Sequence, residues 1–310
     1  MKKLGPFVRF ATAACVLPAL FPQPSFAWGH DGHMMINRIA GAALPADVPE
    51  FLRSPAGLNG LEYYGPEPDR WRSSAEPELN AAKAPDHFID LEEADWLGKL
   101  PRNRYDYIRA LAAAQPAHPN VKMTPEAIGC LPYAAHEYFL NLETAMRDYR
   151  TALAAKEDTK PVEAEIVFLA GILGHFVADG SQPMHVSVQY NGWVGPNPNG
   201  YTTSHNIHSK FEGDFVHDNI KAADFAALVP AKAVVLGDVF EEFIAYLRHS
   251  NSLVEKVYQL DKTDAFDGAG TPEGKVFVDE RLAAGATELR NMIYTAWVKS
   301  ATPVPVYKGN

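Results

Sequence analysis

The feature that most constrains the fold is an apolar segment that carries metal-ligand side chains. Between Leu169 and His185 the chain has the sequence LAGILGHFVADGSQPMH. Its apolar residues recur at helical spacing nearly all round, which predicts a central buried helix that ends at the Gly-Ser-Gln-Pro sequence. His175 and Asp179 are four residues apart and share one face, and His185 follows the helix end. An imidazole and a carboxylate placed this way predict either half of a metal site or a buried hydrogen-bonded pair.

Helical periodicity dominates the rest of the chain, and strand-like alternation is scarce. The sequence therefore predicts an all-α fold in a single mainly helical domain. A glycine, proline and asparagine loop is expected from Asn191 to Thr203, at the edge of the site, and a proline-rich stretch from Pro45 to Pro77 around Asp69. The further helices are expected at Gly32 to Leu44, Arg102 to Ala114, Pro125 to Leu153, Ser204 to Ile220, Leu236 to Val257 and Val276 to Val298.

The N-terminal segment has the pattern of a secretory signal peptide over residues 1–27. Basic residues precede an apolar stretch from Phe10 to Phe21, and Ser-Phe-Ala then fits a cleavage site before Trp28. Cleavage before Cys15, as in a lipoprotein, is the alternative. We expect a mature domain over residues 28–310 that is secreted or periplasmic and has no membrane span.

Charge and cysteine content narrow the function classes. The chain has 28 Lys and Arg against 38 Asp and Glu, and removal of the leader's three basic residues would change the net charge from −10 to −13. That balance excludes a basic nucleic-acid clamp of the usual kind, although buried metal ions could make one cleft locally positive. Only Cys130 would remain after processing, so the fold would depend on its core and its metals.

More imidazole and carboxylate side chains accompany the central helix. His208 and Glu212 repeat the spacing of His175 and Asp179, and His33, Asp69 and His87 lie upstream in short motifs. A set of nitrogen and oxygen ligands with almost no thiol favours zinc over calcium or an iron-sulfur cluster. The alternatives are a surface pair for His208 and Glu212, and a helix-dipole contact for His185.

Five separated motifs carry a resemblance to a known family. WGHDGH at the expected mature N-terminus, DRWR, HFID, HFVAD with QPMH, and NIHSKFE occur in this order between Trp28 and about Phe215. The chain resembles the S1/P1 nucleases and their relatives, the bacterial zinc-dependent phospholipases C. The resemblance implies an all-helical phosphodiesterase with three zinc ions.

The resemblance also implies which residues hold each ion. The first zinc would take Asp69, His87, His175 and Asp179, and the third would take His185, His208 and Glu212. The second would take the amino nitrogen and carbonyl oxygen of Trp28, together with His33 and the bridging Asp179. Three ions and three carboxylates leave a charge of about +3 to face a phosphodiester.

Three further residues match positions that contact substrate in the nucleases. Arg72 would act with Asp69 in catalysis, and its planar fork suits charge on a transferring phosphoryl group. Phe88 and Asp90 would stack on a base and hydrogen-bond its edge. The alternatives are an Arg72 stacked on Trp71 at the surface, and a Phe88 that belongs to the core.

The resemblance implies a secreted, monomeric, zinc-dependent endonuclease. It would hydrolyse single-stranded DNA and RNA to 5′-phosphorylated products, and 3′-nucleotidase activity is compatible with the same site. The nucleases usually have aspartate where this chain has Glu212, which is more similar to the phospholipases. A phospholipase C on phosphocholine-type lipids is therefore the alternative, and a non-catalytic zinc-binding export protein is a third.

The remaining histidines have no matching motif position. His205 is left open, since it lies one turn before His208 on the same face. The other five are expected to be structural or solvated: His30, His118, His136, His217 and His249.

Overall fold

The computed structural model describes residues 28–303. The expected signal peptide over residues 1–27, with the Cys15 alternative, lies outside the described residues, as does the C-terminal segment 304–310. Within 28–303 the secondary structure is helical, and β-pairing is limited to two isolated bridges, Ile89 with Gly129 and Tyr190 with Gly192. The expected all-α fold class is confirmed.

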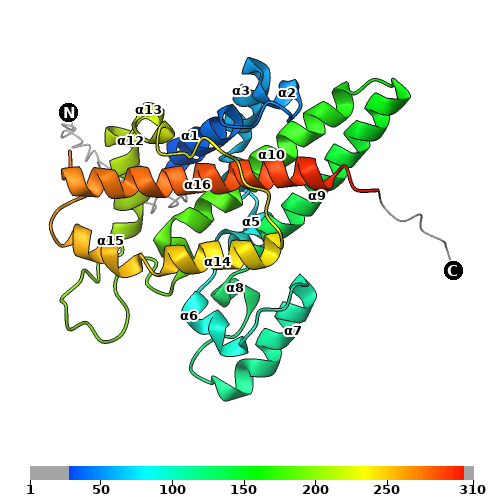
Figure 1. The fold of residues 1–310 in the computed structure, drawn as a ribbon. Coiled ribbons are helices and arrows are strands. Elements are labelled where there is room, and N and C mark those ends of the chain that lie inside the picture. Colours follow the sequence, from blue (N-terminus) through cyan, green and yellow to red (C-terminus); the bar gives the residue numbers. More distant parts are fainter. Residues whose placement is uncertain (1–27, 304–310) are drawn as a thin grey trace, which may run out of the picture.

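The helices form one bundle with smaller elements at its ends (Figure 1). The α-helices are α1 (Gly29–Ala42), α2 (Glu50–Arg53), α3 (Pro55–Tyr64), α4 (Glu67–Arg70), α5 (Pro77–Lys83), α6 (Leu91–Ala94), α7 (Arg104–Ala114), α8 (Pro125–Ile128), α9 (Leu131–Ala155), α10 (Lys160–Ser181), α11 (Ile207–Ser209), α12 (Phe215–Asn219), α13 (Ala222–Ala226), α14 (Val239–Asn251), α15 (Val254–Asp261) and α16 (Pro272–Lys299). The short tighter or wider turns are η1 (Ala84–His87), η2 (Asp95–Leu97), η3 (Gln115–Ala117), η4 (Pro183–Val186) and the π-helical η5 (Lys210–Asp214).

The centre of the bundle is α10, as the sequence predicts. Every residue from Leu169 to Ser181 is buried, and α10 packs against α9, α16, α3 and α1. Gly174 lies so close to its neighbours that a Cβ would come within 2.0 Å of Asn37 Oδ1, which explains a glycine inside a helix. Two ligand candidates, His175 and Asp179, are therefore held at 0% exposure in the centre of the core.

Among the described residues, α10 is also the single helix with the length and composition of a membrane span. It begins at Lys160, so it is longer than the apolar segment from Leu169 described above. Most of the apolar window is buried inside the bundle. Its hydropathy is therefore accounted for by its central position in the core.

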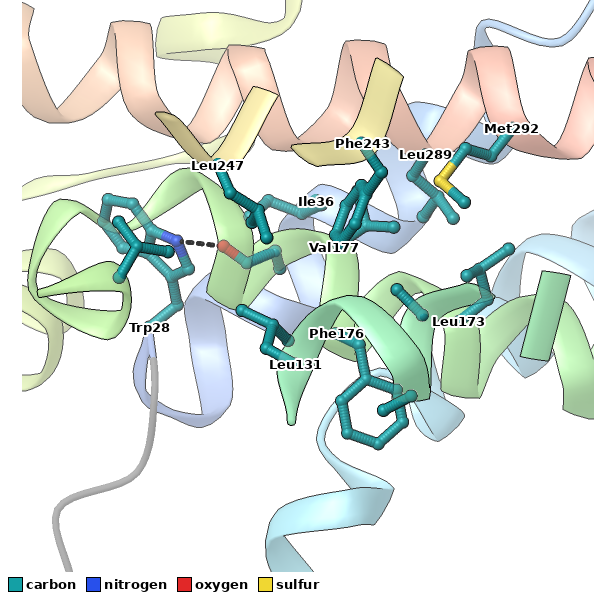
Figure 2. Packing of buried hydrophobic residues seen from close by; sticks show 14 of the residues in the cluster. Trp28, Ile36, Leu131, Leu173, Phe176, Val177, Phe243, Leu247, Leu289 and Met292 are labelled. Carbon is teal, nitrogen blue, oxygen red and sulfur yellow. Dashed lines mark hydrogen bonds between the residues drawn. The ribbon is translucent and has the colours of Figure 1, made fainter. Parts of the chain in front are cut away.

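The core is continuous from α1 to α16. Figure 2 shows Ile36 of α1, Leu173 and Val177 of α10, and Leu289 of α16 meeting in one apolar layer, with Trp28 at one end of it. Apolar side chains from helices far apart in sequence therefore enclose α10. The ligand-bearing face of α10 is fixed by this packing rather than by a loop.

Several expected helix boundaries were wrong. The expected helix from Pro125 to Leu153 is two helices, α8 and α9, because Gly129 has a φ of +89° and lies against the backbone of Phe88. The expected helix from Leu236 to Val257 is likewise divided, between Asn251 and Val254. The region from Ser204 to Ile220 is α11, η5 and α12, and the proline-rich stretch holds α2 to α4.

Candidate metal centre

Five of the predicted ligands meet in one buried group, here called the five-residue cluster. It contains His33 from α1, Asp69 from α4, His87 at the end of η1, and His175 and Asp179 from α10. None of these side chains is more than 4% exposed. The His33 and His175 rings are stacked with centroids 4.0 Å apart. Three other elements therefore converge on α10.

The distances within the five-residue cluster suit a shared set of metal ligands. Asp179 Oδ1 lies 3.4 Å from His33 Nε2, and Asp179 Oδ2 lies 3.3 Å from His175 Nε2. Asp69 Oδ1 lies 3.6 Å from His87 Nε2 and 3.9 Å from His175 Nε2. The structure thus places Asp179 between two imidazoles, and the residues form two overlapping candidate metal groups.

Three other predicted ligands form a second group, here called the three-residue cluster. His185 lies in η4, His208 in α11 and Glu212 in η5. Glu212 Oε1 is 3.0 Å from His208 Nε2, and Glu212 Oε2 is 3.4 Å from His185 Nε2. These three residues form the third candidate metal group, and they are 8% exposed or less.

The outer ring nitrogens of four histidines are all held by backbone carbonyls. His175 Nδ1 faces Gly65 O at 2.9 Å, and His87 Nδ1 faces Lys83 O at 2.9 Å. His185 Nδ1 faces His87 O at 2.6 Å, and His208 Nδ1 faces Tyr190 O at 2.8 Å. A carbonyl only accepts, so each Nδ1 donates its proton, and each Nε2 keeps a lone pair that points into its cluster.

The inward-facing atoms fit a cation. Both oxygens of Asp69 and of Asp179, and the Nε2 atoms of His87, His175 and His185, are buried and have no hydrogen-bond partner among residues 28–303. Buried polar atoms are normally satisfied, and several such atoms facing one point call for a missing positive group. The donor set fits zinc, which binds imidazole nitrogen and carboxylate oxygen.

The pKa values in the five-residue cluster also indicate that a positive group is missing. Burial, and then the neighbouring Asp179, raise the pKa of Asp69 well above its usual value. Burial also raises the pKa of Asp179 to about 7 and lowers the pKa of His87 and His175 well below the usual range. Burial disfavours the charged forms of these four residues, so ionised carboxylates here call for a nearby positive group.

In the three-residue cluster, the attraction between two residues outweighs the effect of burial on their pKa values. Burial opposes charge at His208 and Glu212, but their mutual attraction outweighs it, so the pKa of His208 is raised and the pKa of Glu212 is lowered. Glu212 Oε2 also accepts hydrogen bonds from Gln182 Nε2 at 2.7 Å and from the Trp28 backbone nitrogen at 3.2 Å. The resemblance predicted that Trp28 would share an ion with His33 and Asp179, whereas the partner seen here for its nitrogen belongs to the three-residue cluster.

A cavity of about 420 Å³ opens onto these clusters and holds the predicted substrate residues. Arg72, Phe88 and Asp90 line it beside His87, His185 and His208. Phe88 is only partly buried, and Arg72 lies 3.7 Å from Asp69 Oδ1. Phe88 therefore contributes to the cavity wall, and Arg72 lies beside Asp69 at the same wall.

Sequence reasoning missed part of the cavity lining. Glu126, Tyr190 and Asn191 also line it. Glu126 belongs to α8, which the backbone bridge between Ile89 and Gly129 ties to the Phe88–Asp90 segment. Only the expectation that the loop from Asn191 edges the site indicated any of these residues.

The other histidines lie away from the clusters. His205 is exposed and belongs to none of the candidate metal groups found among the described residues. His30, His217 and His249 are exposed, while His118 stacks on Trp96 and the partly buried His136 contacts Phe139 and Phe240. These five positions agree with the structural or solvated roles expected for them.

An all-helical domain with grouped, buried histidines and carboxylates beside a cleft defines the class of helical metal-dependent hydrolases. Within that class, the family model of S1/P1 nuclease matches residues 28–291, and the chain belongs to this family. The S1/P1 nuclease family is a family of phosphodiester hydrolases, so the chain is of that enzyme class.

Two solved structures are distantly similar. The alpha toxin of Clostridium absonum is 14% identical, with a TM-score of 0.42 over 90% of this chain and 67% of that chain. The alpha-toxin of an avian strain of Clostridium perfringens is 15% identical, with a TM-score of 0.35 over 88% of this chain and 64% of that chain. The chain thus spans about two thirds of the length of these toxins. Comparison with curated proteins gives no match.

Proposed function

We propose that the chain is an exported nuclease with three zinc ions that hydrolyses single-stranded DNA and RNA to 5′-phosphorylated products. The observation that carries this proposal is the cavity, where an arginine, an aromatic ring and a carboxyl meet the inner histidines of both clusters. These groups suit the phosphate, the ring face and the polar edge of one nucleotide.

The proposed zinc ligands follow the two clusters. Asp69, His87, His175 and Asp179 would hold one ion, and His33 with Asp179 and the Trp28 terminus a second; His185, His208 and Glu212 would hold the third. Bound zinc supplies Lewis acidity toward a phosphoryl oxygen and lowers the pKa of water. In this proposal 3′-nucleotidase activity uses the same ligands.

Side chains of the cavity would bind and orient the nucleotide. The Arg72 guanidinium lies at the cavity wall next to Asp69, where its N–H groups can bind the oxygens of a phosphodiester. Phe88 offers a ring face that any base can stack on. Burial, and then Glu93 and Glu92, raise the pKa of Asp90 to about 8. At neutral pH that carboxyl is largely protonated, so it both donates and accepts along the edge of a base.

A phospholipase C on phosphocholine-type lipids is the second candidate. Two observations favour it: the ligand Glu212, and a cavity lined by Phe88, Tyr190 and Glu126 in addition to Asp90. Aromatic rings together with a carboxylate such as that of Glu126 can bind a quaternary ammonium group. Arg72 serves a phosphodiester in either function, so it does not separate the two.

A substrate comparison tests the proposal. The exported protein is assayed on single-stranded DNA and on phosphatidylcholine vesicles at equal phosphodiester concentration, and the Phe88→Ala variant is assayed in parallel. We expect hydrolysis of the DNA, and in the variant a loss of roughly 1 to 3 kcal/mol of nucleotide binding with unchanged zinc content. Faster hydrolysis of the vesicles, with a variant that cuts DNA like the parent, would establish the phospholipase instead.

The location of the enzyme is part of the same proposal. The basic, apolar and small-residue pattern of residues 1–27 supports export, with cleavage between Ala27 and Trp28. Mass analysis of protein recovered from the periplasm and the medium tests this. A protein that keeps residues 1–27 would contradict it.

A further inference from the structure

The side chain of Trp28 has a specific binding site at the end of α10. The Trp28 indole Nε1 donates to Ala178 O at 2.8 Å and to Ser181 Oγ at 2.9 Å. Ser181 Oγ donates in turn to Ala178 O at 2.8 Å. Trp28, Ala178 and Ser181 are each 0% exposed. Figure 2 shows the indole at one end of the apolar layer, with its hydrogen bond dashed.

The carbonyl that receives the indole lies in the last turn of α10. The last four carbonyls of a helix lack the usual backbone donor and need another. The N–H of Gln182, which would continue the helix by bonding to Ala178 O, bonds to Asp179 O instead. The indole N–H and the Ser181 hydroxyl therefore share this carbonyl, and the indole is the donor that comes from outside the helix; a phenylalanine of similar shape could not supply it.

The backbone of Trp28 contacts the three-residue cluster. Its nitrogen lies 3.2 Å from Glu212 Oε2, and its ring packs against Phe211 with centroids 5.5 Å apart. The residue has a φ of +45°, an uncommon conformation for a side chain this bulky. Space for it is left by Gly32, where a Cβ would come within 2.9 Å of Trp28 Cβ. One residue thus joins the end of α10, next to Asp179, to η5, which carries Glu212.

We propose that the Trp28 indole is a positioning group that caps α10 and fixes the turn bearing Asp179 relative to Glu212. Ser181 is its partner, since the hydroxyl accepts from the indole and donates to the same carbonyl. The identity of residue 28 as tryptophan then matters separately from any role of its backbone as a ligand. The consequence for metal binding rests on the proposed metal centre, but the capping itself does not.

Three single variants of the full gene, each with its purified N-terminus verified by mass, test the proposal. Trp28→Phe removes the indole donor, and Ser181→Ala removes its partner. Trp193→Phe is the matched control, because it removes an indole N–H that donates to a backbone carbonyl, Pro196 O at 2.9 Å, in a loop outside α10. The readouts are amide hydrogen exchange of residues 178–185 in chelator-treated protein, and zinc per chain after reloading.

In Trp28→Phe we expect exchange of residues 178–185 to accelerate by about fivefold or more, with reloaded zinc below the parental value. Ser181→Ala should accelerate the same segment less, because Ala178 O keeps the indole. Trp193→Phe should leave the segment unchanged. Exchange within twofold of the parent in both test variants, or equal acceleration in the control, would overturn the proposal. If Trp28→Phe does not fold, Ser181→Ala decides alone. A parent that binds no zinc would contradict the proposed function but not the capping.

Discussion

The five-residue cluster and the three-residue cluster use the same side-chain types but differ in how their charges are balanced. In the five-residue cluster, burial raises the pKa of Asp69 and Asp179, and the Asp69 and Asp179 oxygens have no hydrogen-bond donor among residues 28–303. In the three-residue cluster, the attraction between His208 and Glu212 raises the pKa of His208 and lowers the pKa of Glu212. Ionised carboxylates in the first cluster therefore call for bound cations, whereas in the second cluster protein groups already stabilise the charged form of Glu212.

The largest expected effect comes from the matched pair Asp179→Asn and Glu212→Gln. Asp179→Asn keeps the shape but removes the charge shared by two proposed ions, so at least one should be lost and hydrolysis should fall by orders of magnitude. Glu212→Gln should cost one ion. Atomic emission on both purified variants and a parent expected to hold about three zinc ions measures this. A zinc loss in Glu212→Gln that exceeds the loss in Asp179→Asn would break the comparison.

The second largest effect is expected from Arg72, which lies beside Asp69 of the five-residue cluster. Arg72→Ala should lower turnover by about 10²- to 10³-fold, in the range found for groups that bind transition-state charge. Zinc content should stay parental, because the guanidinium is not a ligand. The checks are kcat on a minimal phosphodiester and zinc per chain. Parental turnover would assign Arg72 to the surface.

A smaller effect is expected at the Trp28 terminus, whose backbone nitrogen lies beside Glu212 of the three-residue cluster. A form made in the cytosol with Met directly before Trp28 keeps every side chain but converts the amine to a peptide nitrogen, which has no lone pair for a metal. Zinc should fall toward about two ions per chain relative to the exported form. Equal zinc and equal specific activity in the two forms of verified mass would show that the terminus is not a ligand.

The smallest effect uses a buried carboxyl with no imidazole partner as a reference. Burial, and then Glu242, raise the pKa of Glu288 to about 7. Its native pKa exceeds the unfolded value of about 4.3, so parental stability should decline between about pH 4.3 and 7 and then level off. Glu288→Gln removes that decline, so its Tm advantage should grow over this range to a few degrees. A pH-independent difference in calorimetry would contradict the assignment.

The sequence predicted which side chains come together better than it predicted the helix boundaries. The spacing of His175 and Asp179 on one helix was enough to predict that they lie together. The order of the motifs added His33, Asp69 and His87, which come from other elements. Boundaries failed where tertiary contacts decide them, as at Gly129, whose φ of +89° follows from a close approach to Phe88. The capping role of Trp28 and the cavity position of Glu126 also depend on contacts between distant segments, which periodicity does not report.

One contact described above links the two clusters through the backbone. His185 Nδ1 donates to His87 O at 2.6 Å, and Ile89 N donates back to His185 O at 2.9 Å. His87 and His185 belong to different clusters, so an ion that orders one ring also orders the peptide groups that orient the other. Metal uptake at the two clusters should therefore be cooperative, and chains with partial loading should be scarce when the metal supply is limiting. The enzyme would then respond to zinc availability as a threshold rather than in proportion to it.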